Sequence, residues 1–191
     1  AVLPSVNLGT GRTATAIDTG SGNHSCALLD NGSVKCWGNN LYGQLGIDNN
    51  TTMGNTSGSM ALLPVVNLGT GRTATAIDAG ENHTCALLDN ASVKCWGRNN
   101  NGQLGIDNTT DMGKTSGSMA VLPSVNLGTG RTATAIDAGY SHTCALLDNA
   151  SVKCWGYNLY GQLGINNNTH MGNTSGSMAQ LTGINLGTGR T

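Results

Sequence analysis

The chain has 191 residues, including 29 glycines, 6 cysteines and no phenylalanine, and its 9 basic and 10 acidic residues leave a formal net charge of −1. Because there is no basic excess to neutralise phosphates, we expect no nucleic-acid binding driven by charge. No apolar run approaches the roughly 18 residues of a transmembrane helix, so we expect no membrane insertion. The glycine content and the scarcity of charged residues argue against long helices. The sequence begins without methionine or an apolar leader, which we interpret as a mature product or a segment of a longer protein.

Internal repetition dominates the sequence. Residues 61–119 and 120–178 align without gaps over 59 positions and are identical at 48 of them, so 11 positions differ. Residues 1–60 form a first unit that is one residue longer, and residues 179–191 begin a fourth unit. We therefore divide the chain into three repeat units and a partial fourth.

The middle unit shows the elements that each repeat is expected to form. Residues 61–68 are apolar and predict a strand, and Pro64 suits its start or a sheet edge. Residues 74–79 alternate small apolar with polar side chains up to a glycine, which predicts a short strand. Residues 83–97 predict a hairpin of two strands. Residues 106–119 are polar and lack a period, which predicts a surface loop.

The turn of this hairpin is a strong local signal. In the first unit it reads Asp30-Asn31-Gly32, which favours a three-residue loop with the glycine in the left-handed conformation. Ala91 and Ala150 occupy the glycine position in the later units. If the geometry is kept, each alanine costs about 1 kcal/mol.

A longer motif recurs in all three units. The middle unit reads AGENHTCALLDNASVKCWGRNNNGQLG, with LPVVNLG upstream. This pattern resembles the regulator of chromosome condensation repeat, and the two cysteines per unit resemble the version found in bacterial cell-surface and secreted proteins. The resemblance implies an all-β fold of tandem four-stranded antiparallel β-blades, seven of which close a β-propeller. The recurring motif residues, for which it implies structural roles, are His24, Trp37, Gln44, His83, Trp96, Gln103, His142, Trp155 and Gln162.

The number of units departs from this pattern. Propellers typically need 4–8 blades, so three units are incomplete as a closed ring. The terminal segments are ordinary repeat sequence and offer no polar cap, so we expect head-to-tail association with copies of the same chain, as a ring or a filament. Residues 179–191 are expected to form an overhanging strand that completes the sheet of the next chain. The alternative is that the chain is a window from a longer array.

The six cysteines occur as three pairs with nine residues between partners. In the middle unit Cys85 and Cys95 are equidistant from Asn90, so a three-residue turn places them directly across the hairpin, where they can be bridged. We predict intra-hairpin disulfides and hence an oxidising, extracellular or cell-surface location. Reduced core cysteines are one alternative. Zinc is another, although His83 with the two cysteines supplies only three ligands. The predicted pairs are Cys26–Cys36, Cys85–Cys95 and Cys144–Cys154.

No catalytic set or cofactor motif emerges. His83, Asp78 and a nearby serine could be combined on paper, but these residue types recur in every unit and no nucleophile elbow is present. Residues 8–13, LGTGRT, lack the lysine and the following helix of a phosphate loop, so we interpret them as a turn. We therefore expect a protein that is not an enzyme and that holds no metal or cofactor.

Asparagines form a second informative pattern. Eleven of them begin an Asn-x-Ser/Thr triplet, and most fall in hairpin tips or polar loops, where a secreted chain could carry glycans. Two other interpretations are that asparagine serves the turns, or that Asp107, Asn108 and Asp111 form a calcium loop. The third unit has Asn166 and His170 in place of both aspartates, which argues against calcium. The candidate glycosylation sites are Asn23, Asn31, Asn49, Asn50, Asn55, Asn82, Asn90, Asn108, Asn149, Asn167 and Asn173.

Together these observations predict a structural subunit of an extracellular fibre or surface assembly, built from disulfide-linked and glycan-bearing β-blade repeats. Near-identical units favour this interpretation, because a polymer needs repeated equivalent contacts. The alternative is a fragment of a β-propeller protein-interaction module, receptor-like or exchange-factor-like.

Overall fold

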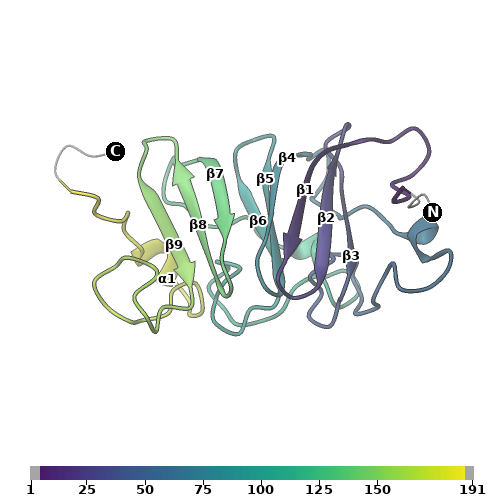
Figure 1. The fold of residues 1–191 in the computed structure, drawn as a ribbon. Coiled ribbons are helices and arrows are strands. Elements are labelled where there is room, and N and C mark those ends of the chain that lie inside the picture. Colours follow the sequence, from purple (N-terminus) through teal and green to yellow (C-terminus); the bar gives the residue numbers. More distant parts are fainter. Residues whose placement is uncertain (1–4, 188–191) are drawn as a thin grey trace.

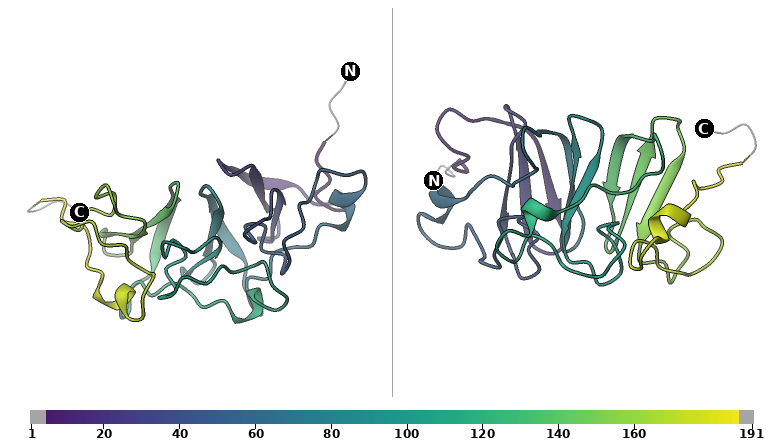
Figure 2. Two further views of the ribbon diagram at one scale, coloured as in Figure 1. Left: turned by 90° about the horizontal axis from the view of Figure 1, so that it is seen from below. Right: turned by 180° about the vertical axis from the view of Figure 1, so that it is seen from behind.

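The computed structural model describes residues 5–187 and is an all-β protein, as expected (Figure 1). Within these described residues, nine strands form three separate antiparallel sheets, which we call blades 1, 2 and 3, with strand orders β1-β2-β3, β4-β5-β6 and β7-β8-β9. Figure 2 shows the blades side by side in an open arc, without ring closure. The strands are β1 (Ala14–Gly20), β2 (His24–Leu29), β3 (Val34–Gly38), β4 (Ala74–Ala79), β5 (His83–Leu88), β6 (Val93–Gly97), β7 (Ala133–Ala138), β8 (His142–Leu147) and β9 (Val152–Gly156). Short helical turns are η1 (Ser59–Leu62), η2 (Met119–Val121) and α1 (Ser177–Gln180). None of the helices within residues 5–187 combines the length and the apolar character that crossing a membrane requires.

The blades have three regular strands rather than the expected four. The apolar segment at the start of each unit runs beside the third strand of the preceding blade. Val66 donates its backbone N–H to the carbonyl of Val34 at 2.9 Å, and Val125 repeats this contact with Val93 at 2.8 Å. Two residues upstream, on the same side of the chain, Pro64 has no N–H to donate. The segment is held by an isolated hydrogen bond and does not form a regular fourth strand, and Thr182 in place of the proline beside blade 3 does not restore one.

The partial fourth unit stays with its own chain. Ile184 donates its N–H to the carbonyl of Val152 at 2.8 Å, so the extended segment lies beside β9. The expectation that this segment completes the sheet of a neighbouring chain is therefore corrected, because it already occupies the outer edge of blade 3. Residues 188–191, the end of the expected overhang, lie outside the described residues.

The predicted hairpin register and disulfides are confirmed. Cys85 is paired directly with Cys95 between β5 and β6, and disulfides join Cys26–Cys36, Cys85–Cys95 and Cys144–Cys154. The turn residues Gly32, Ala91 and Ala150 have φ values of 74°, 60° and 62°, which confirms the left-handed geometry. The alanines therefore carry the predicted conformational cost. All sulfurs that a zinc site would need are oxidised.

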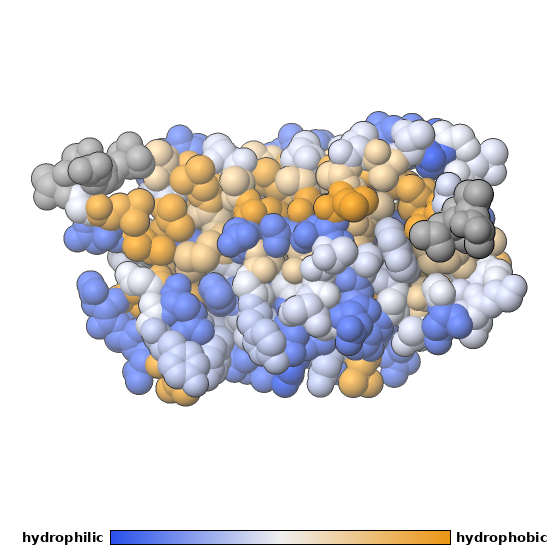
Figure 3. All heavy atoms as spheres, in the orientation of Figure 1, coloured by the Kyte–Doolittle hydropathy of each residue, from blue (hydrophilic) through white to orange (hydrophobic). Residues whose placement is uncertain are grey.

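The core lies between neighbouring blades as well as within them. Trp96 and Trp155 are fully buried, as are Met119 and Met178. These methionines end segments that we expected to be surface loops, and Met112 and Ser118 in the middle segment are buried too, so that expectation is wrong at these residues. The sparse apolar residues of a polar segment are the ones that anchor it to a core. Figure 3 shows that apolar residues gather in a band over the strands, whereas the lower half of the face, where the loops run, is mostly hydrophilic.

Candidate interaction surfaces

Adjacent blades are joined by a repeated hydrogen-bond cluster built on the Gly-Gln-Leu-Gly turn. The backbone carbonyl of Gln44 in unit 1 accepts hydrogen bonds from the Trp96 indole at 3.1 Å and from the Thr84 hydroxyl at 2.8 Å. Between units 2 and 3, the carbonyl of Gln103 accepts the same two bonds from Trp155 and Thr143 at 3.1 and 2.9 Å. One carbonyl thus aligns two strands of the next blade.

The recurring histidines complete this cluster. His24 Nε2 lies 2.9 Å from the Thr84 hydroxyl, and His83 Nε2 lies 2.9 Å from that of Thr143. Because each hydroxyl gives its only proton to a glutamine carbonyl, the histidine must donate from Nε2, which fixes the neutral tautomer. Burial lowers the pKa of His24 to about 4 and the pKa of His83 to about 3. These histidines are therefore uncharged structural donors at neutral pH.

The shape of the turn requires its glycines. A Cβ atom on Gly43 would lie 2.4 Å from the backbone nitrogen of Lys114 in the next unit, and one on Gly46 would lie 2.7 Å from the Trp96 indole nitrogen. Both glycines have positive φ values, 84° and 66°. The turn therefore packs backbone against backbone, and no side chain could be accommodated there.

Aspartates make further contacts across the blade boundaries. Asp48 accepts hydrogen bonds from the Met119 N–H at 2.8 Å and the Ser118 hydroxyl at 3.0 Å. Asp107 does the same with unit 3, through Met178 and Ser177. Asp78 accepts a bond from the Ala138 N–H at 2.9 Å, and burial raises the pKa of this aspartate to about 6. Sequence reasoning missed these contacts, because the partners lie about one repeat apart in the chain.

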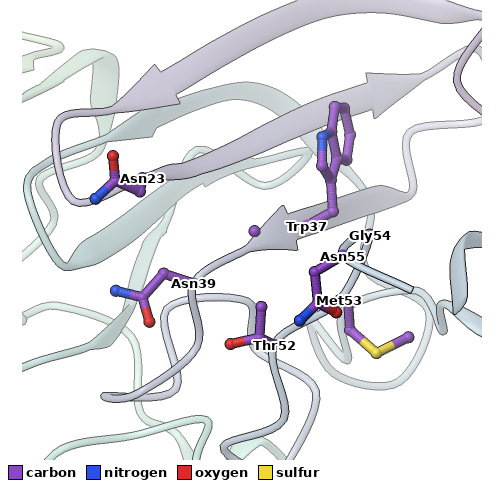
Figure 4. Close-up of a pocket in the computed structure, with 8 residues that line it drawn as sticks. Asn23, Trp37, Asn39, Thr52, Met53, Gly54 and Asn55 are labelled. Atoms are coloured by element: carbon purple, nitrogen blue, oxygen red, sulfur yellow. The ribbon is translucent and has the colours of Figure 1, made fainter.

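Blade 1 carries the receiving half of such a boundary, and no partner for it lies within residues 5–187. Here Trp37 is only half-buried, whereas its counterparts Trp96 and Trp155 are fully buried. A cavity of about 380 Å³, which we call the blade-1 cavity, opens beside it (Figure 4). It is lined by Asn23, Trp37, Gly38, Asn39, Thr52, Met53, Gly54 and Asn55.

The blade-1 cavity corresponds to the surface that holds a Gly-Gln-Leu-Gly turn at the interior boundaries. Trp37 and Gly54 match Trp96 and Gly113, which pack against Gly46 and Gly43 in the turn of unit 1. Ser25 keeps the hydroxyl of Thr84 at the matching position. The two groups that would donate hydrogen bonds to an incoming glutamine carbonyl, the Trp37 indole N–H and the Ser25 hydroxyl, are thus both present.

Blade 3 carries the inserting half. The turn of unit 3 keeps its internal hydrogen bond, from the Gly164 N–H to the Gly161 carbonyl at 3.0 Å, compared with 2.9 Å between Gly46 and Gly43 in unit 1. A Cβ atom on Gly161 would have no heavy atom within 4 Å. The turn is therefore already in its packing conformation, with its contact surface open.

The same repeat pattern is found in known proteins. The regulator of chromosome condensation (RCC1) repeat matches residues 31–87 and 92–146, and a second version of this repeat matches residues 14–44, 74–103 and 133–162. The chain belongs to the RCC1 repeat family. Its fold agrees with this membership, since it resembles yeast RCC1 (Prp20), solved bound to Kap60, with a TM-score of 0.65 at 21% identity over 90% of this chain and 37% of that one. Human WBSCR16 gives a TM-score of 0.69 at 18% identity, covering 93% of this chain and 41% of that one.

Curated relatives of this RCC1 repeat chain are much longer proteins. It is 31% identical over 147 residues to the Ultraviolet-B receptor UVR8 of Arabidopsis thaliana, covering 76% of this chain and 30% of the receptor. It is 31% identical over 150 residues to the probable E3 ubiquitin-protein ligase HERC4 of Homo sapiens, covering 77% of this chain and 13% of HERC4. The chain therefore spans less than a third of either relative.

The candidate glycosylation sites lie mostly at the surface. Asn31, Asn90 and Asn149 are exposed at the hairpin tips, and each accepts a hydrogen bond from the serine hydroxyl of its own triplet at 2.7–2.8 Å. This contact also serves the turn, in line with the second interpretation. Asn82 is buried, which leaves no room for a glycan there. Asn173 is half-buried, and the remaining candidates, Asn23, Asn49, Asn50, Asn55, Asn108 and Asn167, are exposed.

Proposed function

We propose that this chain is a structural assembly module, in which the Gly-Gln-Leu-Gly turn of one copy inserts into the blade-1 cavity of the next. The observation that carries the proposal is the complementarity of the two flanks. Blade 1 presents Trp37 and Ser25 without an acceptor, and blade 3 presents the Gln162 turn without donors. Two copies joined in this way would repeat a contact that the chain already makes twice.

The proposal extends to the setting of the assembly. The three disulfides support an oxidising compartment, and the exposed Asn-x-Ser/Thr triplets are consistent with glycans on the outer surface. We therefore propose a subunit of an extracellular fibre or surface array without enzymatic activity. The arc of the blades decides whether head-to-tail addition closes a ring or continues as a filament.

Gly161→Asn tests the assembly directly. Asparagine tolerates the φ of 77° at this position, and the space beside Gly161 is open within one chain. In the assembly the new side chain would meet backbone atoms of the next copy, as a side chain on Gly43 would meet Lys114. We expect the unmodified chain to sediment as concentration-dependent oligomers and Gly161→Asn to sediment as a monomer.

Gly176→Asn is the matched control. Gly176 also has a positive φ, 78°, and open space around it, but it lies before α1 and outside both flanks. It should leave the oligomers intact, and electron microscopy of those oligomers would separate rings from filaments. A chain that remains monomeric at the highest attainable concentration would overturn the proposal.

A second candidate function is a protein-interaction module, and the relatives favour it. UVR8 is a receptor, HERC4 is a probable ubiquitin ligase, and yeast RCC1 was solved bound to Kap60. As this second candidate, we infer that the RCC1 blades of this chain present a recognition surface to another protein. A cavity between blades 2 and 3 gives this candidate a specific location.

A further inference from the structure

A second cavity, of about 330 Å³, lies where the loops of blades 2 and 3 meet. We call it the tyrosine cavity, and it is lined by Arg98, Asn101, Tyr140, Ser141, Tyr157 and Tyr160. Its side chains take no part in the glutamine-centred hydrogen-bond cluster that joins the blades, although the backbone carbonyl of Tyr140 accepts the Glu81 N–H at 3.3 Å.

Every residue that lines the tyrosine cavity occupies a position at which units 2 and 3 differ. Arg98 and Asn101 correspond to Tyr157 and Tyr160, and residues 140–141 correspond to residues 81–82. Because 48 of the 59 aligned positions are identical, differences placed without regard to structure would not be expected to supply a complete lining. The repeats keep their framework constant and vary this surface. Such a division is characteristic of repeat proteins whose variable positions bind a ligand.

The tyrosine cavity also gathers most of the tyrosines of the chain. Three of the chain's four tyrosines line it, and the ring of the fourth, Tyr42, lies 4.8 Å from the Arg98 guanidinium. Tyr140 and Tyr160 are 67% and 84% exposed. Exposed tyrosines around a single arginine are the composition of energetic hot spots in protein recognition.

The charge of the tyrosine cavity indicates which chemical group it can bind. Arg12, Arg72 and Arg131 each pair with an aspartate at 3.3 Å, whereas Arg98 forms no ion pair with any residue that the structure describes. Stacking on Tyr42 orients the Arg98 guanidinium and leaves its N–H groups available for a carboxylate. Glu81 forms no ion pair with Arg98; its carboxylate lies at Tyr140, where it raises the pKa of that tyrosine.

We propose that the tyrosine cavity binds an acidic peptide segment of another protein. An aspartate or glutamate side chain pairs with Arg98, and the adjacent side chain packs among Tyr140, Tyr157 and Tyr160. A volume of about 330 Å³ suits a short segment rather than a folded domain. The cavity lies inside one chain, but Tyr160 directly precedes Gly161 of the inserting turn, so peptide binding is to be measured on the monomeric chain.

A phage-displayed library of random short peptides, selected on the purified chain, tests the inference. We expect the selected peptides to be enriched in aspartate and glutamate, and their binding to weaken with added salt. Arg98→Asn and Tyr160→Asn should each reduce affinity about tenfold or more. Both variants place at the cavity a residue that the same position already holds in another unit, namely Asn39 and Asn101, so the fold should tolerate them.

Leu159→Asn is the matched control, and melting curves confirm folding of each variant. Leu159 is 52% exposed in the same loop, lies outside the cavity, and is asparagine in unit 2. It should leave peptide affinity unchanged. The inference is overturned if no peptide is selected, if the peptides are not acidic, or if Arg98→Asn binds them as well as the unmodified chain. Binding of neutral oligosaccharides in place of peptides would also overturn it. Peptide binding is measured below the concentration at which the unmodified chain forms oligomers, which separates this test from that of the assembly.

Discussion

The interior blade boundaries and the two open flanks are built from the same residues in different surroundings. Trp96 and Trp155 are buried and donate to a glutamine carbonyl, whereas Trp37 occupies the same place in its blade and is half-exposed beside a cavity. Gln103 is buried under the next blade, while Gln162 is half-exposed. The comparison teaches that an RCC1 motif residue gains its role from the neighbouring blade. Mutations at matched positions can therefore separate what a blade does alone from what a boundary adds.

The largest difference should come from the tryptophans. Trp96→Ala removes a fully buried indole and its hydrogen bond to Gln44, and should cost about 4 kcal/mol of unfolding free energy. Trp37→Ala should cost only about 1–2 kcal/mol, because this indole is half-exposed and has no such partner in the chain. Urea denaturation of the two variants, at a concentration at which the chain is monomeric, measures both. Equal losses of unfolding free energy would show that contacts with the neighbouring blade do not increase the contribution of the tryptophan.

The next largest effect should appear in acid. His24 and His83 have folded pKa values of about 4 and about 3, below the ordinary value of 6.5. At pH values between the folded and the unfolded pKa of each histidine, the unfolded chain binds more protons than the folded one. Stability is therefore lost as the pH falls from 6.5 towards 4. The loss should reach about 3 kcal/mol for His83. Asp78 opposes it, because its pKa is raised to about 6 and its protonation therefore favours the folded state as the pH falls from 6.

The histidine of blade 3 sharpens this acid comparison. Burial also lowers the pKa of His142, but His142 is only half-buried, since no blade follows it in the chain. Stability curves measured from pH 7 to about pH 4.5 should therefore flatten more in His83→Gln than in His142→Gln. If the two variants flatten the curve equally, the covering blade is not the cause of the shift.

An intermediate effect is expected at the aspartates that bridge the blades. Asp48→Ala removes two hydrogen bonds to unit 2's last turn, while Asn166→Ala alters the corresponding residue on the open side of blade 3. Both positions have positive φ, 57° and 59°, so both variants carry the same conformational cost of alanine. The difference between their losses should be about 2 kcal/mol, the value of charge-assisted bonds to a buried backbone group. Chemical denaturation of both variants checks it, and a difference near zero would contradict it.

The sequence predicted contacts between residues that are close together in the chain and missed contacts between residues that are far apart in it. The hairpin register, the disulfides and the left-handed turn residues follow from contacts within about ten residues, and the printed pattern determines them. The bonds from Asp48 to Met119 and from Thr84 to Gln44 join separate units and depend on how the blades stack. Recurrence of the motif indicated that these residues were structural, but it did not identify their partners.

Two further features depend on the three-dimensional arrangement. The missing fourth strand is one of them, because the segment at the start of each unit makes a single backbone hydrogen bond to the preceding blade, with or without a proline, although the family pattern favoured a strand there. The tyrosine cavity combines residues from two units, about 40–60 positions apart in the chain. A signal for it did exist, because the differences between units 2 and 3 mark its lining, but they had to be placed on the fold before they formed a surface.

The smallest expected effect tests whether the energy of the hairpin turn depends on the neighbouring blade. Ala91 in the interior blade and Ala150 in the flanking blade have φ values of 60° and 62°, at hairpin tips with exposed asparagines beside them. Ala91→Gly and Ala150→Gly should each stabilise the chain by about 1 kcal/mol, because glycine adopts this conformation without strain. Thermal denaturation measures both, and Gly32→Ala should destabilise by more than this, because its Cβ would also lie 2.7 Å from the Cβ of Thr73 in the next unit. Equal gains in the two blades would show that the turn energy is local, whereas a gain in only one would mean that the covering blade also constrains the tip.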